Sequence, residues 1–199
     1  MDRKLAEVAE IRMGYSFRSR IEGAPEGNWS VVQMKDIDED SRLHYEALVT
    51  IQADLGSPKQ VLQKGDLVFR SRGQINTAAL VDREIDQVLL ASPLLLVRPK
   101  RDVVPQYLQW WINTPATQAA LSELAEGTSV RMVSKESLQK LEVPVPSLEI
   151  QKAIAELASM AAREQELLAE LSRLRRRWSD VVLCDLANRK ANSVMNRGG

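Results

Sequence analysis

Three short polar segments hold the side chains best suited to contacting nucleic acid. They lie at residues 14–20 (GYSFRSR), 70–77 (RSRGQINT) and 127–135 (GTSVRMVSK). Arginine can pair with both acceptor atoms of guanine and glutamine or asparagine with adenine, while hydroxyl and basic groups bind phosphates. The candidate DNA-binding residues are therefore Tyr15, Ser16, Arg18, Arg20, Arg70, Arg72, Gln74, Asn76, Thr128, Ser129, Arg131 and Lys135.

Each of these segments also fits a simpler interpretation when it is taken alone. Solvated polar loops have the same composition, and Tyr15 and Phe17 alternate as core residues on one face of a strand would. The arginines at positions 173 and 175–177 are similarly open to two interpretations. They fit a solvated helix face, or a docking surface for a partner subunit or the DNA backbone.

The sequence predicts no catalytic or metal site. It has no nucleophile elbow, P-loop or HExxH motif, and it lacks the glycine-rich loop and the Asn-Pro-Pro-aromatic motif that an adenine methyltransferase needs. The one histidine, His44, lies in a polar stretch, and Cys184 fits a small apolar role better than that of a reactive thiol. A single cysteine excludes an internal disulfide and a multi-thiolate zinc site. We expect a protein that is not an enzyme and that binds no cofactor or metal.

Composition allows a folded core but gives no electrostatic case for DNA binding. The 199 residues are 44% hydrophobic, and 27 basic side chains balance 27 acidic ones. Residues 1–148 hold 18 basic and 20 acidic side chains, a balance of −2, and residues 149–199 hold 9 and 7, a balance of +2. The absence of a long apolar run or a signal-peptide pattern predicts a cytoplasmic protein without a membrane span.

Residues 1–146 are predicted to form a mixed α/β domain. Short apolar runs bounded by turn signals predict strands at 29–34, 66–70, 88–97 and 141–145. Residues 105–124 have the pattern of a helix, which the Thr114-Pro115 pair breaks into two. The sequence VPVP at 143–146 favours an extended segment and ends the domain.

From residue 147 to 187 the pattern predicts one long helix, with Ser147 as its N-cap. Apolar residues recur at alternating steps of three and four, as in a coiled-coil seam, with Glu164 as the exception. A helix from residue 150 to 181 is about 48 Å long, so the seam needs a partner helix. The predicted dimer interface consists of Ile150, Leu157, Met160, Leu167, Leu171, Leu174, Trp178 and Val181. Residues 188–199 are expected to form a flexible tail.

The order of these pieces resembles half of a type I restriction-modification specificity subunit. Residues 4–17 (KLAEVAEIRMGYSF) resemble the opening of a target-recognition domain, and residues 62–73 (LQKGDLVFRSRG) resemble its central segment. The most specific match runs from GTSV at 127–130 through VPVP to SLEIQ at 147–151 and AIA at 153–155. The family usually has Glu-Glu before that glutamine, where this chain has Glu149-Ile150.

The resemblance implies a function and a set of partners. A complete specificity subunit has two recognition domains and two conserved helices that pair antiparallel, whereas this chain has one of each. Two copies paired through their helices would restore that architecture and read a bipartite, inverted-repeat DNA target. Modification subunits, which methylate adenine with S-adenosylmethionine, would dock on the dimer, and a restriction subunit would join them. The cofactor would then belong to the partner.

Three other functions stay open at this point. One is that of a fragment of a fused methyltransferase-specificity enzyme, which would require catalytic motifs upstream of Met1. A regulatory or decoy half-subunit that pairs with a full-length specificity subunit would share every motif above. A coiled-coil assembly module that binds protein instead of DNA would agree better with the zero net charge. The clustered Arg, Gln, Asn and Thr side chains argue against that module.

Overall fold

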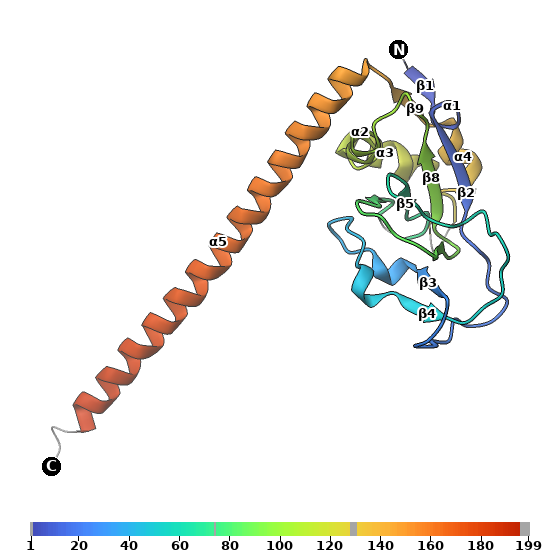
Figure 1. Ribbon diagram of the computed structural model, residues 1–199. Coiled ribbons are helices and arrows are strands. Elements are labelled where there is room, and N and C mark those ends of the chain that lie inside the picture. Colours follow the sequence, from blue (N-terminus) through green and yellow to red (C-terminus); the bar gives the residue numbers. More distant parts are fainter. Residues whose placement is uncertain (1, 74, 128–130, 196–199) are drawn as a thin grey trace. The chain divides into compact units, whose positions relative to one another are not determined.

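The computed structural model describes residues 2–73, 75–127 and 131–195, with side chains described up to residue 187 (Figure 1). The chain divides into two compact units, Met1–Ala155 and Glu156–Gly199. The first unit is a mixed α/β domain, and helix α5 (Leu148–Met195) begins in it and makes up the second. The predicted fold class, a mixed α/β domain followed by a long helix, is therefore confirmed.

The centre of the domain is a four-stranded antiparallel sheet in the order β2-β8-β5-β6. Its strands are β2 (Ala9–Met13), β8 (Leu95–Pro99), β5 (Leu67–Phe69) and β6 (Ala78–Leu80). Leu67 and Phe69 belong to one core cluster, while Val68 between them belongs to another. Because both faces of the sheet are buried, its central strands are continuous apolar runs instead of alternating ones.

Helices cover one face of this sheet, where they share a core cluster with Leu67 and Phe69. They are α1 (Leu5–Val8), α2 (Pro105–Ile112), α3 (Pro115–Leu124) and α4 (Lys135–Lys140). The predicted break of the 105–124 helix is confirmed. Thr114 caps α3 by accepting a hydrogen bond from the Thr117 backbone N–H, and Pro115 occupies the first helical position.

A three-stranded sheet, in the order β4-β3-β7, packs with the opposite side of the core. Its strands are β3 (Trp29–Val32), β4 (Val49–Ile51) and β7 (Val88–Leu90), and β3 runs antiparallel to β4 and parallel to β7. The 3₁₀ helices η1 (Met34–Asp36) and η2 (Tyr45–Ala47) lie between β3 and β4 in the chain.

A separate strand pair joins the N-terminal strand to the end of the domain. Strand β1 (Asp2–Lys4) pairs antiparallel with β9 (Glu142–Pro144), directly before α5 begins. The Tyr107 hydroxyl donates to the Pro144 carbonyl at 2.6 Å, and Ser147 caps α5 by accepting from the Ile150 N–H at 3.5 Å. The predicted N-cap is therefore confirmed.

The structure differs from the predicted elements in three places. Residues 88–97 form two strands, β7 and β8, because the chain turns at 91–94, where the Leu94 N–H donates to the Ala91 carbonyl and the Ser92–Pro93 bond is cis. Strand β3 ends at Val32, and Met34 already begins η1. Helix α5 extends to Met195, beyond the predicted end at residue 187, and the flexibility of residues 188–199 stays a prediction.

Candidate nucleic-acid interface

The three candidate segments meet at one end of the four-stranded sheet, around the turn at 91–94. Segment 14–20 follows β2 and packs directly on this turn. The Gly14 N–H donates to the Leu94 carbonyl at 2.8 Å, and the Ser92 N–H donates to the Tyr15 carbonyl at 3.0 Å. A Cβ on Gly14 would lie 2.4 Å from the carbonyl carbon of Ala91, so only glycine allows this approach.

Segment 70–77 reaches the same turn from the end of β5. The Ser71 hydroxyl donates to the Pro93 carbonyl, and the Ser71 carbonyl accepts from the Val133 N–H at 2.8 Å. Arg72 pairs with Met132 as an antiparallel bridge, and the Gly73 N–H donates to the Arg131 carbonyl at 3.2 Å. The described parts of the three segments and the turn thus form one surface, which we call the loop cluster.

The α2–α3 junction holds the far end of segment 70–77. The Asn113 side chain accepts from the Ala78 N–H and donates to the Ala78 carbonyl, both at 2.9 Å. The Gln118 amide donates to the Asn76 carbonyl at 3.0 Å. Asn76 is itself buried, and its amide donates to the Arg70 carbonyl at 3.0 Å. This segment is therefore fixed at both ends before any ligand binds.

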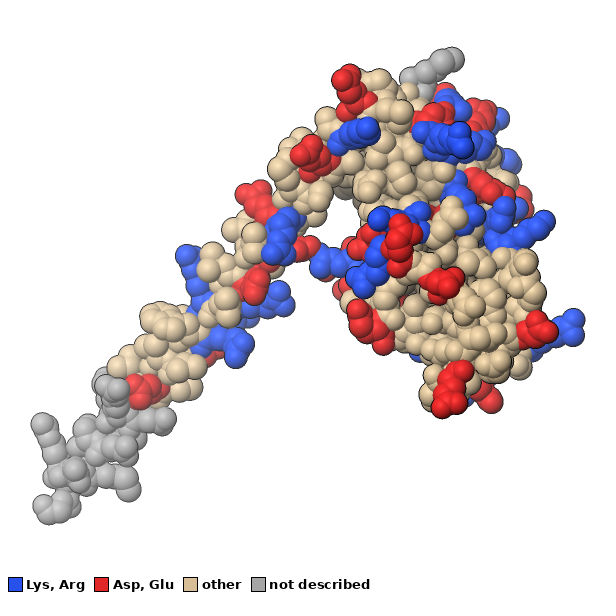
Figure 2. Space-filling view, viewed as in Figure 1, with Lys and Arg blue, Asp and Glu red and all other residues tan. Residues whose placement is uncertain are grey.

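The loop cluster is locally cationic although the chain is neutral. The three segments contain five arginines, one lysine and no aspartate or glutamate. Ser16, Arg18, Arg20 and Arg72 are exposed. By contrast, Lys and Arg alternate with Asp and Glu over the face drawn in Figure 2, without a continuous basic patch. On the loop cluster, attraction for phosphates therefore depends on a few basic side chains.

Some predicted DNA-binding residues already have structural partners. The Arg131 guanidinium donates to the carbonyls of Ser122 and Ala125, so it caps the C-terminal end of α3. Lys135 is half-buried in the first turn of α4. Gln74, Thr128 and Ser129 lie outside the described residues. A role in DNA binding stays a prediction for all of these.

Arg70 differs from the other arginines of the cluster. It is half-buried, and its Nε atom is buried without a hydrogen-bond partner among the groups that the structure describes. A buried donor without a partner costs about 1–3 kcal/mol. The Nε atom of Arg70 is thus a buried donor that the described part of the chain leaves unsatisfied.

A hollow of about 460 Å³ borders segment 14–20. It is lined by residues 15–22 and by Ile51, Gln52, Ala53 and Leu55. Tyr15 and Phe17 meet edge to face with ring centroids 4.9 Å apart, and Phe17 packs against the small core cluster that contains Val31 and Ile51. The two aromatic rings therefore hold the loop that carries Arg18 and Arg20.

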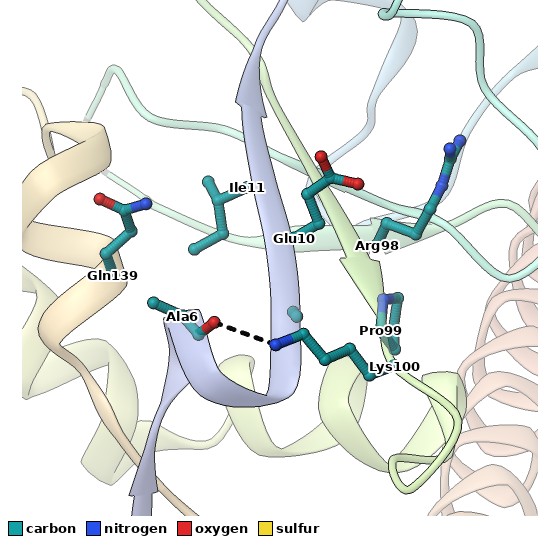
Figure 3. A pocket seen from close by; sticks show the side chains of 8 residues that line it. Ala6, Glu10, Ile11, Arg98, Pro99, Lys100 and Gln139 are labelled. Carbon is teal, nitrogen blue, oxygen red and sulfur yellow. Dashed lines mark hydrogen bonds between the residues drawn. The ribbon is translucent and has the colours of Figure 1, made fainter.

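A second hollow, of about 470 Å³, lies at the other end of the β2–β8 pair (Figure 3). There Lys100 donates to the Glu7 carbonyl at 2.7 Å. Arg98 forms a two-pronged ion pair with the buried Asp66, with both N–O distances 2.7 Å, and these bonds raise the pKa of Arg98. Because both cations already bond to groups of the domain itself, this hollow is a weaker candidate for a DNA-binding site than the loop cluster.

The predicted interface residues on α5 are exposed to solvent. All eight are large hydrophobic side chains, with exposed fractions from 44% at Leu171 to 69% at Trp178. Apolar surface of this extent marks a binding surface. Among the described residues, no group of His, Cys, Asp and Glu could hold a metal ion, and no helix is long and apolar enough to cross a membrane.

Comparison with known proteins decides the family. A family model described as the type I restriction modification DNA specificity domain matches residues 1–173. The chain belongs to this family. A comparison with curated proteins gives no match.

Solved structures share the fold of this specificity domain. The S subunit of a type I restriction-modification system from M. genitalium is 17% identical, with a TM-score of 0.56, over 89% of this chain and 42% of its own. The HsdS subunit from Thermoanaerobacter tengcongensis is 21% identical, with a TM-score of 0.60, over 87% and 39%. A chain from a type I system studied for complex assembly is 22% identical, with a TM-score of 0.58, over 87% and 43%. This specificity domain therefore spans about two fifths of those chains.

Sequence reasoning missed two residues that organise the specificity domain. Gln151 is fully buried, and its side chain bonds the backbone of Asp102, Val104 and Pro146. It stands in the family-like SLEIQ motif, which gave no hint of its partners. Ser71 links segment 70–77 to the turn, whereas the sequence singled out only its neighbours Arg70 and Arg72.

Proposed function

We propose that this chain is the non-catalytic DNA-reading subunit of a type I restriction-modification system, and that it acts as a homodimer on a bipartite target. The observation that carries the proposal is the loop cluster. Three segments far apart in the sequence, all able to pair with bases and phosphates, are held together at one end of a rigid sheet in a chain of the DNA specificity family.

Within the loop cluster, we assign one role to the exposed arginines and another to the arginine that bonds to backbone carbonyls. Arg18, Arg20 and Arg72 project from backbone that is fixed by hydrogen bonds and aromatic packing, so they are the candidates for contacts with base edges and phosphates. Arg131 acts through the fold by capping α3. Each base pair that is read would contribute about 1–3 kcal/mol of discrimination.

A homodimer accounts for the exposed apolar side chains of α5. The chain spans about two fifths of the solved specificity subunits, and its helix leaves eight large apolar side chains in solvent. A second copy would cover them and supply a second loop cluster. A two-fold dimer presents two identical loop clusters in opposite orientation, so the DNA target would be an inverted repeat. The paired helices would set the length of the spacer between its half-sites.

Methylation and cleavage are assigned to partner subunits. Modification subunits would bind the dimer, carry S-adenosylmethionine and methylate adenine, and a restriction subunit would join them. These partners would also supply phosphate-binding charge, which accounts for the neutral composition of this chain.

A selection experiment tests this proposal. The chain is purified with modification subunits of the same organism, and the complex selects from random double-stranded DNA. We expect an inverted repeat with a fixed spacer. Recovery of a single half-site or an asymmetric motif that needs a full-length specificity subunit favours the decoy function. Recovery of no motif favours the protein-assembly module.

A further inference from the structure

Five exposed charged residues flank the apolar stripe of α5 with a seven-residue period. They are Glu149, Glu156, Arg163, Glu170 and Arg177. In heptad terms they occupy the g positions. The a positions are Ile150, Leu157, Glu164, Leu171 and Trp178, and the d positions are Ala153, Met160, Leu167, Leu174 and Val181. Side chains at g positions select the orientation and register of paired helices.

Specificity subunits of this family pair their conserved helices antiparallel, and for such a pair of α5 helices we propose one register, with Glu164 of one copy level with Leu167 of the other. This inference rests on the homodimer proposed above and adds its geometry. In an antiparallel pair each a residue packs against a d residue of the other helix. The two-fold axis then passes between positions 165 and 166.

Side-chain size supports this register. Ala153, the smallest residue of the stripe, lies level with Trp178 of the second copy, the largest. Leu157 lies level with Leu174, Met160 with Leu171, and Ile150 with Val181. Facing a small residue with a large one fills the space between helices without voids or strain. Leu168, which is also exposed on the single chain, lies beside Ala161 of the second copy.

Charge supports the register more strongly, because g positions face g positions in an antiparallel pair. Arg163 faces Glu170 of the second copy, and Glu156 faces Arg177, and each pair occurs twice by symmetry. In the single chain Arg163 pairs with Glu166 on the same helix at 2.9 Å, and it is exposed there. Such an exposed pair contributes little, so sharing Arg163 with Glu170 costs little.

The alternative arrangements bring more like charges together. A shift of one heptad in one direction places Arg163 against Arg163 and Glu156 against Glu170, and its only attraction between g positions joins Glu149 to Arg177. A shift in the other direction places Glu170 against Glu170 and Arg163 against Arg177. A parallel pair in register would place Glu164 against Glu164 inside the stripe. The alternating signs therefore favour a single register and oppose its nearest competitors.

Charge reversal in the full chain tests the register. Arg163→Glu and Glu170→Arg are each made alone and together, and dimer dissociation is measured by sedimentation at low ionic strength. Each single variant turns two attractions into two repulsions, so we expect its Kd to rise about tenfold. The double variant should return to within about threefold of the wild type. A mixture of the two single variants should form a heterodimer. These changes should shrink in high salt.

Other outcomes overturn the proposal in distinguishable ways. In the register shifted one way, Glu170→Arg alone would tighten the dimer, and in the register shifted the other way Arg163→Glu alone would do so. In a parallel pair Arg163→Glu would change little, because position 163 then faces Leu168. If the wild type is dimeric and every variant has the same dimer Kd as the wild type, the register is contradicted but the homodimer is not. A monomeric wild type contradicts the homodimer of the proposed function itself.

Discussion

Replacing Gln151 with leucine should destabilise the domain although it removes no apolar contact. The Gln151 side chain is fully buried in the first turns of α5. Its Oε1 accepts from the Val104 N–H at 2.8 Å, and its Nε2 donates to the carbonyls of Asp102 at 3.1 Å and Pro146 at 2.9 Å. Leucine has a similar size but can form none of these three bonds.

The expected loss follows from those three hydrogen bonds. Each intramolecular bond is worth about 1 kcal/mol net, and the partly buried Val104 N–H would lose its acceptor. We therefore expect a decrease of about 3–4 kcal/mol in the free energy of unfolding. That is a large part of the roughly 5–15 kcal/mol that holds a typical domain folded.

Urea unfolding followed by tryptophan fluorescence measures this loss. Trp29, Trp110 and Trp111 report on the domain. The measurement is made in chains that also carry Leu167→Asp and Leu171→Asp, so that dimer dissociation does not contribute. Lys152→Ala, an exposed neighbour of Gln151, is the matched control and should change little. A loss below about 1 kcal/mol for Gln151→Leu would refute the role assigned to these bonds.

Three further predictions test other parts of the account. Leu167→Asp with Leu171→Asp should give a monomer in sedimentation, because each side chain buried in the dimer is worth about 1.5–3 kcal/mol; an intact dimer would place the interface elsewhere. Arg72→Ala should relax the selected DNA motif at one position of each half-site, at about 1–3 kcal/mol, whereas uniform weakening on all sequences would make Arg72 a phosphate contact. Arg98→Met should lower stability by about 3–5 kcal/mol in thermal unfolding, because it leaves the Asp66 carboxylate buried and unpaired; a change under 1 kcal/mol would contradict this.

Local patterns predicted much of the fold. Proline and threonine at 114–115 placed the break between α2 and α3, and Ser147 marked the start of α5, because caps and proline act within a few residues. The run at 88–97 was interpreted as one strand because both strands it contains are buried and apolar. The turn between them depends on contacts with Gly14 and Tyr15, about 75 residues away in the sequence.

The position of the candidate site and the role of each of its residues stay predictions. Composition alone pointed to three segments, and the structure brings their described parts together. Composition could not distinguish the role of Arg131, which caps α3, from that of Arg72, which is exposed. That difference depends on where the end of α3 lies in the folded domain. The partners of Gln151 come from the 102–104 turn and from Pro146, and no sequence period marks such contacts.

The central claim is that two copies of this chain read one DNA target. The most direct test co-expresses the chain with modification subunits of the same organism and maps every methylated adenine in the host DNA by sequencing. We expect methylation at an inverted repeat with one fixed spacer, and its loss in the Leu167→Asp, Leu171→Asp variant. An asymmetric motif, or a motif that the monomeric variant still directs, would contradict the claim.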